Sequence, residues 1–191
     1  AAIVGSDGRP INKNALIALI SSIILEEHPQ TTIVTDSVTS NGLAKFIKAR
    51  GGIHHRFKRG YKNVINEAIR LNEEGRESHL AIETSGHAAI KENYFLDDGA
   101  YLISKILVKA AKLYRESQDI GQLISDLDEA LEDKEIRLKI EDKDFRSYAN
   151  KLIKSLSEKI KDIDGWAEVA DNYEGIRVDC RDEKGWFLMR S

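Results

Sequence analysis

The sequence is poor in cysteine and proline, and it has no apolar stretch long enough to cross a membrane. Cys180 is the one cysteine among 191 residues, so no disulfide can form within the chain, and this favours a cytoplasmic location. The longest strongly apolar run, ALIALISSIIL at 15–25, is interrupted by two serines and is shorter than a bilayer span. We therefore predict neither a membrane helix nor a secretory leader.

The chain also lacks a large excess of charge of either sign. Its 29 lysines and arginines face 32 aspartates and glutamates, which gives a formal net charge of -3. Nucleic acids and anionic membranes favour basic surfaces, so we expect neither as a partner. A hydrophobic content of 41% suits one or two compact domains with a core.

Strand-like and helix-like segments alternate through the first part of the chain. The predicted strands are 1–4, 31–35, 53–57 and 79–83, and the predicted helices are 13–27, 41–50, 62–74 and 99–117. Asn12 is a candidate cap of the first helix. This alternation predicts an α/β fold in which helices sandwich a sheet, and HAAIKE at 87–92 adds a hairpin strand that makes the sheet mixed.

The order of elements changes after a polar, acidic stretch at 117–134. We interpret this stretch, which holds the short helical pattern DIGQLISDLDEAL, as a connection between a domain at 1–116 and a second domain at 135–191. In the second domain we expect a β-α-β-β order, extended by one further strand, which is α+β. Its predicted elements are a strand at 135–141, a helix at 143–161 and strands at 167–170, 175–180 and 185–190.

A loop with ligand-binding chemistry lies between two apolar runs at 79–101. Glu83 and Ser85 are two residues apart, so on an extended strand end their side chains project to the same side, where they can bond polyol hydroxyls. His87 adds an imidazole, and Gly86 lets the backbone turn sharply beside a ligand. The alternative is an ordinary hairpin in which Ser85 and Gly86 only turn the chain.

A second candidate site is the basic segment RFKRGYKN at 56–63. It gathers Arg56, Lys58, Arg59 and Lys62 around Gly60 where a predicted strand meets a predicted helix. Backbone N–H groups and the helix dipole bind anions well at such junctions. The alternative is a solvated basic loop.

Other signals favour structural roles. His54 and His55 are adjacent on a predicted strand, so their rings point to opposite faces and cannot chelate one metal together. Asp97 and Asp98 are placed to cap the next helix, and Cys180 is typical of a small packed side chain.

Four segments together resemble the α-D-phosphohexomutase family, which contains the phosphoglucomutases and phosphomannomutases. These are GGIHHRFKRGYKNVI at 51–65, ETSGH at 83–87, DDGAY at 97–101 and GIRVDCRDEKGWFLMRS at 175–191. The resemblance covers the third domain and the first part of the fourth in a four-domain family. We therefore expect the chain to be a fragment with a truncated C-terminal domain.

The resemblance assigns the basic segment to the reacting end of the substrate. Gly60, Tyr61 and Lys62 are similar to a glycine-aromatic-lysine motif found in part of the family, where the lysine lies near the reacting hydroxyl. It implies that Lys62 is the general acid or base and that Arg59, Gly60 and Tyr61 contribute to substrate binding.

Glu83, Ser85 and His87 resemble the family loop that grips the hydroxyls on ring carbons three and four. The family usually has glycine before this glutamate, whereas this chain has Ile82, and a β-branched residue resists unusual backbone angles. Ring-hydroxyl specificity is therefore expected to differ.

Arg190 and Ser191 resemble the opening of the family's R-x-S loop, which implies phosphate binding. The phosphoserine loop and the D-x-D-x-D-R magnesium loop of the family have no counterpart in this sequence. Mg²⁺ is thus expected to be held outside this chain in the full-length enzyme, with no cofactor or metal site within it.

The resemblance implies reversible phosphoryl transfer between the 1 and 6 positions of glucose or mannose phosphate, through a phosphoserine and a bisphosphorylated intermediate. The expected partner is a hexose phosphate, the isolated fragment is expected to be inactive, and the oligomeric state is left open. One alternative is a non-catalytic carbohydrate or nucleotide-sugar binding module on the same fold. Another is a regulatory domain using the acidic surface at 126–144, although that charge run is more simply a solvated linker.

Overall fold

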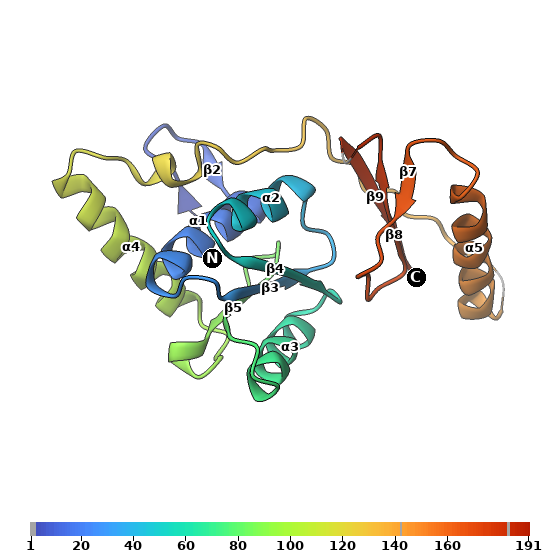
Figure 1. Cartoon of the computed structure of the whole chain (residues 1–191), viewed down its shortest axis with the longest axis horizontal. Coiled ribbons are helices and arrows are strands. Elements are labelled where there is room, and N and C mark those ends of the chain that lie inside the picture. Colours follow the sequence, from blue (N-terminus) through green and yellow to red (C-terminus); the bar gives the residue numbers. More distant parts are fainter. Residues whose placement is uncertain (1–2, 142, 183) are drawn as a thin grey trace. The chain divides into compact units, whose positions relative to one another are not determined.

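The computed structural model describes residues 3–141, 143–182 and 184–191 (Figure 1). The chain divides into two compact units, residues 1–130 and residues 131–191, each of which is described by itself. We call them the first unit and the second unit.

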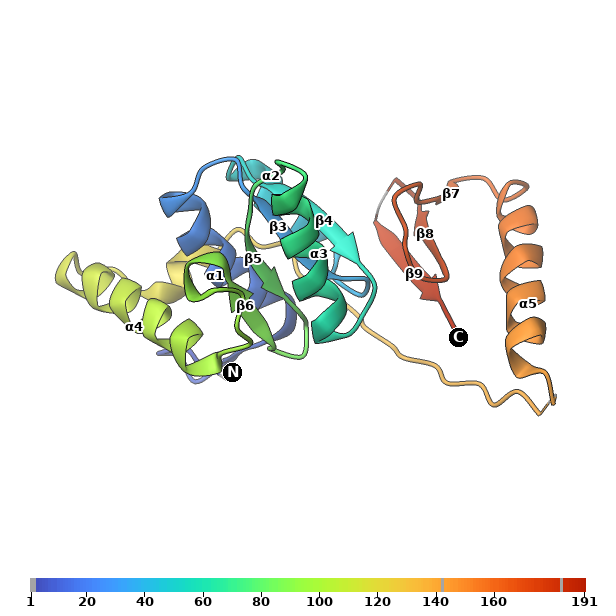
Figure 2. The ribbon, with the colours of Figure 1, turned by 90° about the horizontal axis from the view of Figure 1, so that it is seen from below.

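The first unit is built on a four-stranded sheet with the order β4-β3-β5-β6. Its elements are β3 (Thr32–Asp36), β4 (Ile53–Phe57), β5 (Ser78–Ile82) and β6 (Ala88–Ile90). Strands β4 and β5 both pair with β3 in parallel, and β6 pairs with β5 antiparallel (Figure 2). The predicted mixed sheet is therefore confirmed.

Helices cover both faces of this sheet. They are α1 (Lys13–Glu27), α2 (Asn41–Ala49), α3 (Tyr61–Glu73) and α4 (Gly99–Arg115). Neighbouring residues of β3 enter different cores: Ile33 packs with α1, α2 and α4, whereas Val34 packs with α3. Because side chains alternate across a strand, these two cores lie on opposite faces of the sheet (Figure 1). The predicted helix sandwich is thus confirmed.

The helix caps agree in part with expectation. Asn12 precedes α1 as predicted, but within the described residues its side chain makes no capping hydrogen bond. Ser40 caps α2, and Asp98 caps α4 by accepting from the N–H groups of Ala100 and Tyr101. At the N-terminus, β1 (Ile3–Val4) and β2 (Pro10–Ile11) form a small hairpin. The predicted strand at 1–4 is confirmed for 3–4, and residues 1–2 lie outside the described part.

The segment after α4 packs on the first unit. It contains the 3-10 helix η2 (Ile120–Ile124), whose apolar side chains join the core around α1. Arg50 lies over the ring of Phe46 and donates to the Leu123 carbonyl and to both carboxylate oxygens of Asp126. The early part of the predicted connection is therefore bound to α2.

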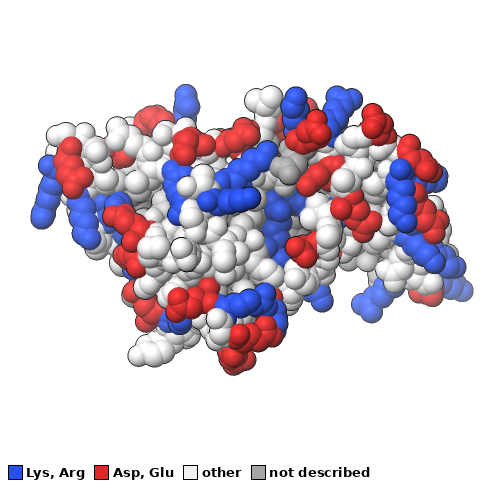
Figure 3. All heavy atoms as spheres, viewed as in Figure 1, with Lys and Arg blue, Asp and Glu red and all other residues white. Residues whose placement is uncertain are grey.

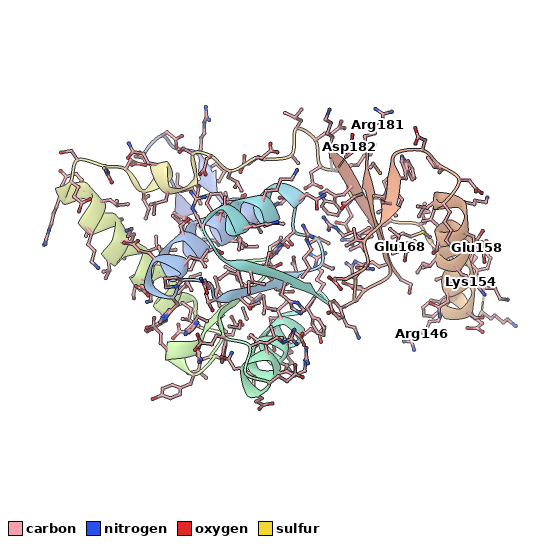
Figure 4. All side chains as sticks on the ribbon, in the orientation of Figure 1. Arg146, Lys154, Glu158, Glu168, Arg181 and Asp182 are labelled. Carbon is pink, nitrogen blue, oxygen red and sulfur yellow. The ribbon has the colours of Figure 1, made fainter. Side chains whose placement is uncertain are left out.

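The second unit combines one helix with a three-stranded antiparallel sheet of order β7-β8-β9. Its elements are α5 (Phe145–Ile160), β7 (Trp166–Glu168), β8 (Ile176–Cys180) and β9 (Gly185–Met189). The small core centres on Ile160, Ile176 and Val178. Figure 4 labels charged residues along α5, together with Glu168 of β7, which accepts from Ser157 Oγ at 2.7 Å.

The strand predicted at 135–141 is wrong, because this segment is irregular in the structure. Its alternating apolar residues suit a strand, yet Ile136 and Leu138 are 71% and 82% exposed. A strand needs a partner for its backbone N–H and C=O groups, and none of the described strands pairs with this segment. Without this strand, the observed order of the second unit is α-β-β-β.

Charges are mixed on the surface. Acidic and basic side chains are interspersed over the face shown in Figure 3. No helix among the described residues is long and apolar enough to span a membrane.

Candidate functional site

The carboxyl ends of the parallel strands β3, β4 and β5 meet at one edge of the sheet. The helix after β3 covers one face, and the helix after β4 covers the other, so the connections diverge on either side of β3. Ligands bind to open α/β sheets at such a switch point, outside the carboxyl ends of the strands. The loops at this edge are 37–40, 58–60 and 83–87.

Glu83 joins two of these loops. Its Oε1 accepts from the Gly60 N–H at 2.6 Å, and its Oε2 accepts from Ser85 Oγ at 3.2 Å. Gly60 adopts a φ of +115° just before α3, a conformation that favours glycine, and its N–H lies at the positive end of that helix. The Glu83 side chain is 5% exposed, and a carboxylate bonded in this way still has lone pairs for a ligand hydroxyl.

The 83–87 loop is a tight hairpin turn between β5 and β6. The Glu83 N–H donates to the His87 carbonyl and the Gly86 N–H donates to the Glu83 carbonyl, both at 2.9 Å. Gly86 has a φ of +91°, which explains the glycine. Ser85 and His87 are exposed, so their side chains are open to a ligand.

An aromatic contact adds to the link between the basic segment and the hairpin. The ring of Tyr61 stacks on the ring of His87 at 5.2 Å between centroids, and His87 Nδ1 lies 2.7 Å from Asp97 Oδ2. Lys62, in the first turn of α3, has its Nζ 6.0 Å from the Tyr61 ring centroid. Arg59 is exposed. The predicted residues of both segments thus occupy one surface.

Arg56, the first basic residue of the 56–63 segment, makes structural contacts within the first unit. Its Nη2 donates to the Ser40 carbonyl at 2.8 Å and to Asn41 Oδ1 at 3.0 Å. It therefore ties the end of β4 to the loop that follows β3.

Two acidic residues that support the site were not identified from the sequence. Asp97 was expected at a helix cap, but its carboxylate contacts His87 and accepts from the Ala88 N–H. Asp36, at the end of β3, accepts from Thr84 N–H at 3.1 Å and from Thr84 Oγ1 at 2.6 Å. Asp36 could have been identified from the sequence, because an aspartate at the end of a fully buried strand is unusual.

Burial raises the pKa of the Asp36 carboxyl, although its hydrogen bonds from Thr84 act in the opposite direction. The charge of Glu83 raises this pKa further, and that of Arg59 lowers it. The carboxyl of Asp36 and the groups on the other two loops are thus close enough to influence one another.

The remaining predicted residues belong to the second unit and to β5. Arg190 and Ser191 follow β9 in the second unit, where Arg190 Nη1 donates to Glu174 Oε1 at 2.9 Å. Ile82 is fully buried in β5 and pairs with Ala88, so the side chain that replaces the usual glycine is part of the core.

The adjacent histidines bond to different partners. His54 Nε2 lies 2.8 Å from Thr35 Oγ1, whereas His55 Nε2 lies 2.8 Å from Glu67 Oε1 on α3. Within the described ranges, no three or more His, Cys, Asp or Glu side chains are grouped to hold a metal ion.

Comparisons with known proteins agree with this architecture. Residues 12–130 match the family described as phosphoglucomutase/phosphomannomutase, alpha/beta/alpha domain III. The chain is 25% identical over 190 residues to the phosphoglucomutase of Neisseria gonorrhoeae and, equally, to that of Neisseria meningitidis. Each alignment covers 99% of this chain and 38% of the relative.

A solved structure is similar over the whole chain. It is a phosphoglucomutase/phosphomannomutase family protein from Burkholderia thailandensis, with 28% identity and a TM-score of 0.72. The match covers 100% of this chain and 37% of that protein. From its matched domain and its sheet architecture, we conclude that the chain belongs to the phosphoglucomutase/phosphomannomutase family.

Proposed function

We propose that this chain is the sugar-binding part of a phosphohexomutase that moves a phosphoryl group between the 1 and 6 positions of a hexose phosphate. The observation that carries the proposal is the bond from the Gly60 N–H to Glu83 Oε1. It joins the basic 58–62 segment and the 83–87 hairpin at the carboxyl edge of the sheet, where α/β proteins bind ligands.

The two segments have complementary chemistry for a phosphorylated sugar. Glu83 and Ser85 offer acceptors and a donor for ring hydroxyls, and His87 supplies a further polar group beside the stacked Tyr61 ring. Arg59 supplies positive charge for a phosphoryl group at the start of α3, where the helix dipole also favours an anion. In this arrangement Lys62 exchanges a proton with the reacting hydroxyl.

We further propose that Arg190 and Ser191, which follow β9 in the second unit, bind a phosphate group. An arginine fork suits this task, because it can bond two phosphate oxygens at once. In the structure, Arg190 Nη1 donates to Glu174, and the guanidinium has further N–H donors that can bond a phosphate.

The phosphoserine and Mg²⁺ belong to the proposed full-length enzyme, outside this chain. The described residues offer no cluster suited to a metal. We therefore propose that the isolated chain is inactive. We also place the enzyme in the cytoplasm, which suits a chain with a single cysteine.

Substitution of Lys62 in the full-length enzyme tests the proton-transfer role. General acid–base catalysis contributes about 10²–10⁴-fold to rate, so Lys62→Ala should lower kcat by at least about 100-fold and change KM much less. The matched control is Lys48→Ala, which removes an exposed lysine from α2 and should leave both constants unchanged. A Lys62→Ala variant with normal kcat would remove this residue from the mechanism.

Substitution of Glu83 tests sugar recognition. Glu83→Gln keeps an acceptor for the Gly60 N–H but removes the negative charge, and it should raise KM for glucose 1-phosphate about tenfold. Unchanged steady-state constants would contradict the assignment. If the full-length protein binds hexose phosphates but does not convert them, the mutase hypothesis is wrong and the alternative, a non-catalytic sugar-binding module, is supported.

A further inference from the structure

A buried carboxylate at the switch point accepts two hydrogen bonds from the hairpin that carries the proposed sugar-binding groups. The side chain of Asp36 is 0% exposed and lies at the carboxyl end of β3, the strand between β4 and β5. Its Oδ2 accepts from both the N–H and the hydroxyl of Thr84. Thr84 lies between Glu83 and Ser85, so Asp36 is hydrogen-bonded to the hairpin between the two proposed sugar-binding residues.

The backbone of Asp36 is itself held in place. Thr39 Oγ1 donates to the Asp36 carbonyl at 3.0 Å, and Thr35 Oγ1 donates to the same oxygen at 3.3 Å. The backbone that carries the Asp36 side chain is therefore held by the end of β3 and by the loop that follows it.

These contacts form a continuous chain of bonds across three strand ends. Asp36 joins the end of β3 to Thr84, after β5, and the neighbouring Glu83 joins this hairpin to Gly60, after β4. Gly60 begins the helix that contains Lys62. The position of the acceptor for sugar hydroxyls thus depends on a residue that is itself fully shielded from solvent.

A purely structural role explains this arrangement poorly. Burial of a carboxylate is costly, and two donors from a neighbouring threonine could be satisfied by a neutral acceptor. Asp36 Oδ1 is buried and has no hydrogen-bond partner within the described part of the chain, so the full cost of burial is not recovered locally. A charged acceptor does, however, bind donors more firmly and hold them in a narrower geometry than a neutral one.

We propose that Asp36 is a positioning residue for substrate binding, which acts through Thr84 to aim Glu83 and Ser85 at the ring hydroxyls of the hexose. The inference rests on the proposed function and extends it to a residue that does not touch the substrate. Loss of the Asp36 side chain therefore loosens the hairpin and weakens binding while the chemical step is retained.

The experiment combines a structural and a kinetic measurement on the same substitutions. In the 191-residue chain, amide hydrogen exchange at residues 84–86 is compared with exchange at the buried β3 amides, for wild type, Asp36→Ala, Asp36→Asn and Thr84→Val. In the full-length enzyme, KM and kcat for glucose 1-phosphate are measured for the same variants. Asp36→Asn and Thr84→Val keep the test decisive should Asp36→Ala fail to fold.

The expected result is a rise in KM with little change in kcat. A hydrogen bond to a charged acceptor is worth more than a neutral one, so Asp36→Ala should raise KM by more than about tenfold, with kcat within about threefold of wild type. Thr84→Val keeps the N–H bond and loses only the hydroxyl bond, so its KM should rise less, by about three- to tenfold. Thr84→Ser restores the hydroxyl and should restore KM. Exchange at 84–86 should quicken in the order of the KM changes.

Thr31→Val is the matched control. It also removes a hydroxyl bond of a buried threonine, here to His79 Nδ1 at 2.7 Å, from the end of the sheet opposite the site. It should lower stability without altering KM or exchange at 84–86.

The outcomes separate this inference from the proposed function. Unchanged exchange at 84–86 in the Asp36 variants overturns the inference, and so does a loosened hairpin with an unaltered KM in an enzyme whose wild type is active. A wild-type full-length protein without mutase activity overturns the proposed function and, with it, the substrate role of Asp36.

Discussion

The two units of this chain differ in how completely they bury their apolar residues. In the first unit, helices cover both faces of the sheet and two cores enclose its strands. In the second unit, one helix and three strands enclose a small core centred on Ile160, Ile176 and Val178. Similar local patterns have therefore produced regular elements in both units but very different degrees of burial.

This difference implies unequal stability. Hydrophobic stabilisation grows with buried apolar area, and small units bury a smaller fraction of their surface than large ones. The second unit also holds a buried cation outside its apolar core, since Arg177 alternates on β8 with the core residues Ile176 and Val178 and its guanidinium lies 3.8 Å from the centroid of the Trp186 ring. We expect the second unit to unfold first.

A core substitution in the first unit should have the largest effect and tests whether the two units unfold independently. Leu80 is fully buried in β5, so Leu80→Ala should cost about 2–5 kcal/mol of stability. Both tryptophans, Trp166 and Trp186, lie in the second unit, so their fluorescence reports on it, whereas far-UV circular dichroism reports on both units. In urea, the substitution should shift the dichroism transition and leave the fluorescence transition in place.

The wild-type chain and a matched leucine substitution complete this test. In wild type, the fluorescence midpoint should lie at lower urea than the main dichroism transition. Leu107→Ala removes a leucine of α4 that is 63% exposed, so it should change stability by less than about 0.5 kcal/mol. Coincident transitions that Leu80→Ala shifts together would show that the units unfold as one.

The stability of the first unit should also depend on pH, through the buried carboxylate of Glu67. Hydrogen bonds from Arg70 and then from His55 lower the pKa of Glu67 below its ordinary value of 4.5. As pH falls, the unfolded chain therefore takes up this proton first. The stabilisation is complete above pH 4.5 and is lost as pH falls through the lower folded-state pKa.

Glu67→Gln should lower the free energy of unfolding by about 1–3 kcal/mol at neutral pH, because charge-assisted hydrogen bonds are lost. The difference from wild type should shrink as pH falls below 4.5, as measured by urea midpoints from circular dichroism. A difference that stays constant down to acid pH would contradict the ionic role of Glu67.

A smaller effect concerns the thiol of the second unit. Burial, together with the charge of Asp179, raises the pKa of Cys180 above its ordinary value of 9.0. At pH 8 the thiol should therefore react with a disulfide reagent more slowly than a free cysteine does. In urea, the rate of thiol reaction should rise at the same urea concentration at which tryptophan fluorescence changes, and Leu80→Ala should leave that concentration unchanged. A reaction rate that rises instead with the unfolding of the first unit would contradict independent unfolding of the second.

The smallest effect is expected in the irregular 135–141 segment. Ile136 is largely exposed and has no strand partner within the described structure, so Ile136→Ser should change stability by less than about 0.5 kcal/mol. The measurement is the fluorescence midpoint in urea. A loss above about 1 kcal/mol would show that the segment packs against the second unit in solution.

Most of the fold could be predicted because local patterns and long-range packing agree. The helix at Lys13–Glu27 and the strand at Ile53–Phe57 were predicted with the observed bounds, and the other predicted helices and strands of the first unit differ from those observed by a residue or two. The short strand β2 was not predicted. The 135–141 segment was the failure. Its alternation is a valid strand pattern, but strand formation depends on a partner that periodicity alone does not supply.

The candidate site was only partly predictable. Glu83, Ser85 and Lys62 could be singled out because their residue types and their positions beside glycine turns carry chemical information. The contacts of Asp36 with Thr84 could not, because 48 residues separate the two partners in sequence. The stacking of Tyr61 on His87 likewise depends on how the loops meet. The roles proposed for the site residues stay predictions.

Residue type and short-range spacing were enough to predict the alternation of strands and helices and the positions of the glycine turns. They also carried the resemblance to a family of sugar-phosphate enzymes. Tertiary packing places Glu83 against the Gly60 N–H and Asp36 against Thr84. It also leaves the 135–141 segment without a partner among the described strands. The physical reason is that parallel pairing brings distant strand ends together, and the bonds formed there depend on register and burial, which no local pattern encodes.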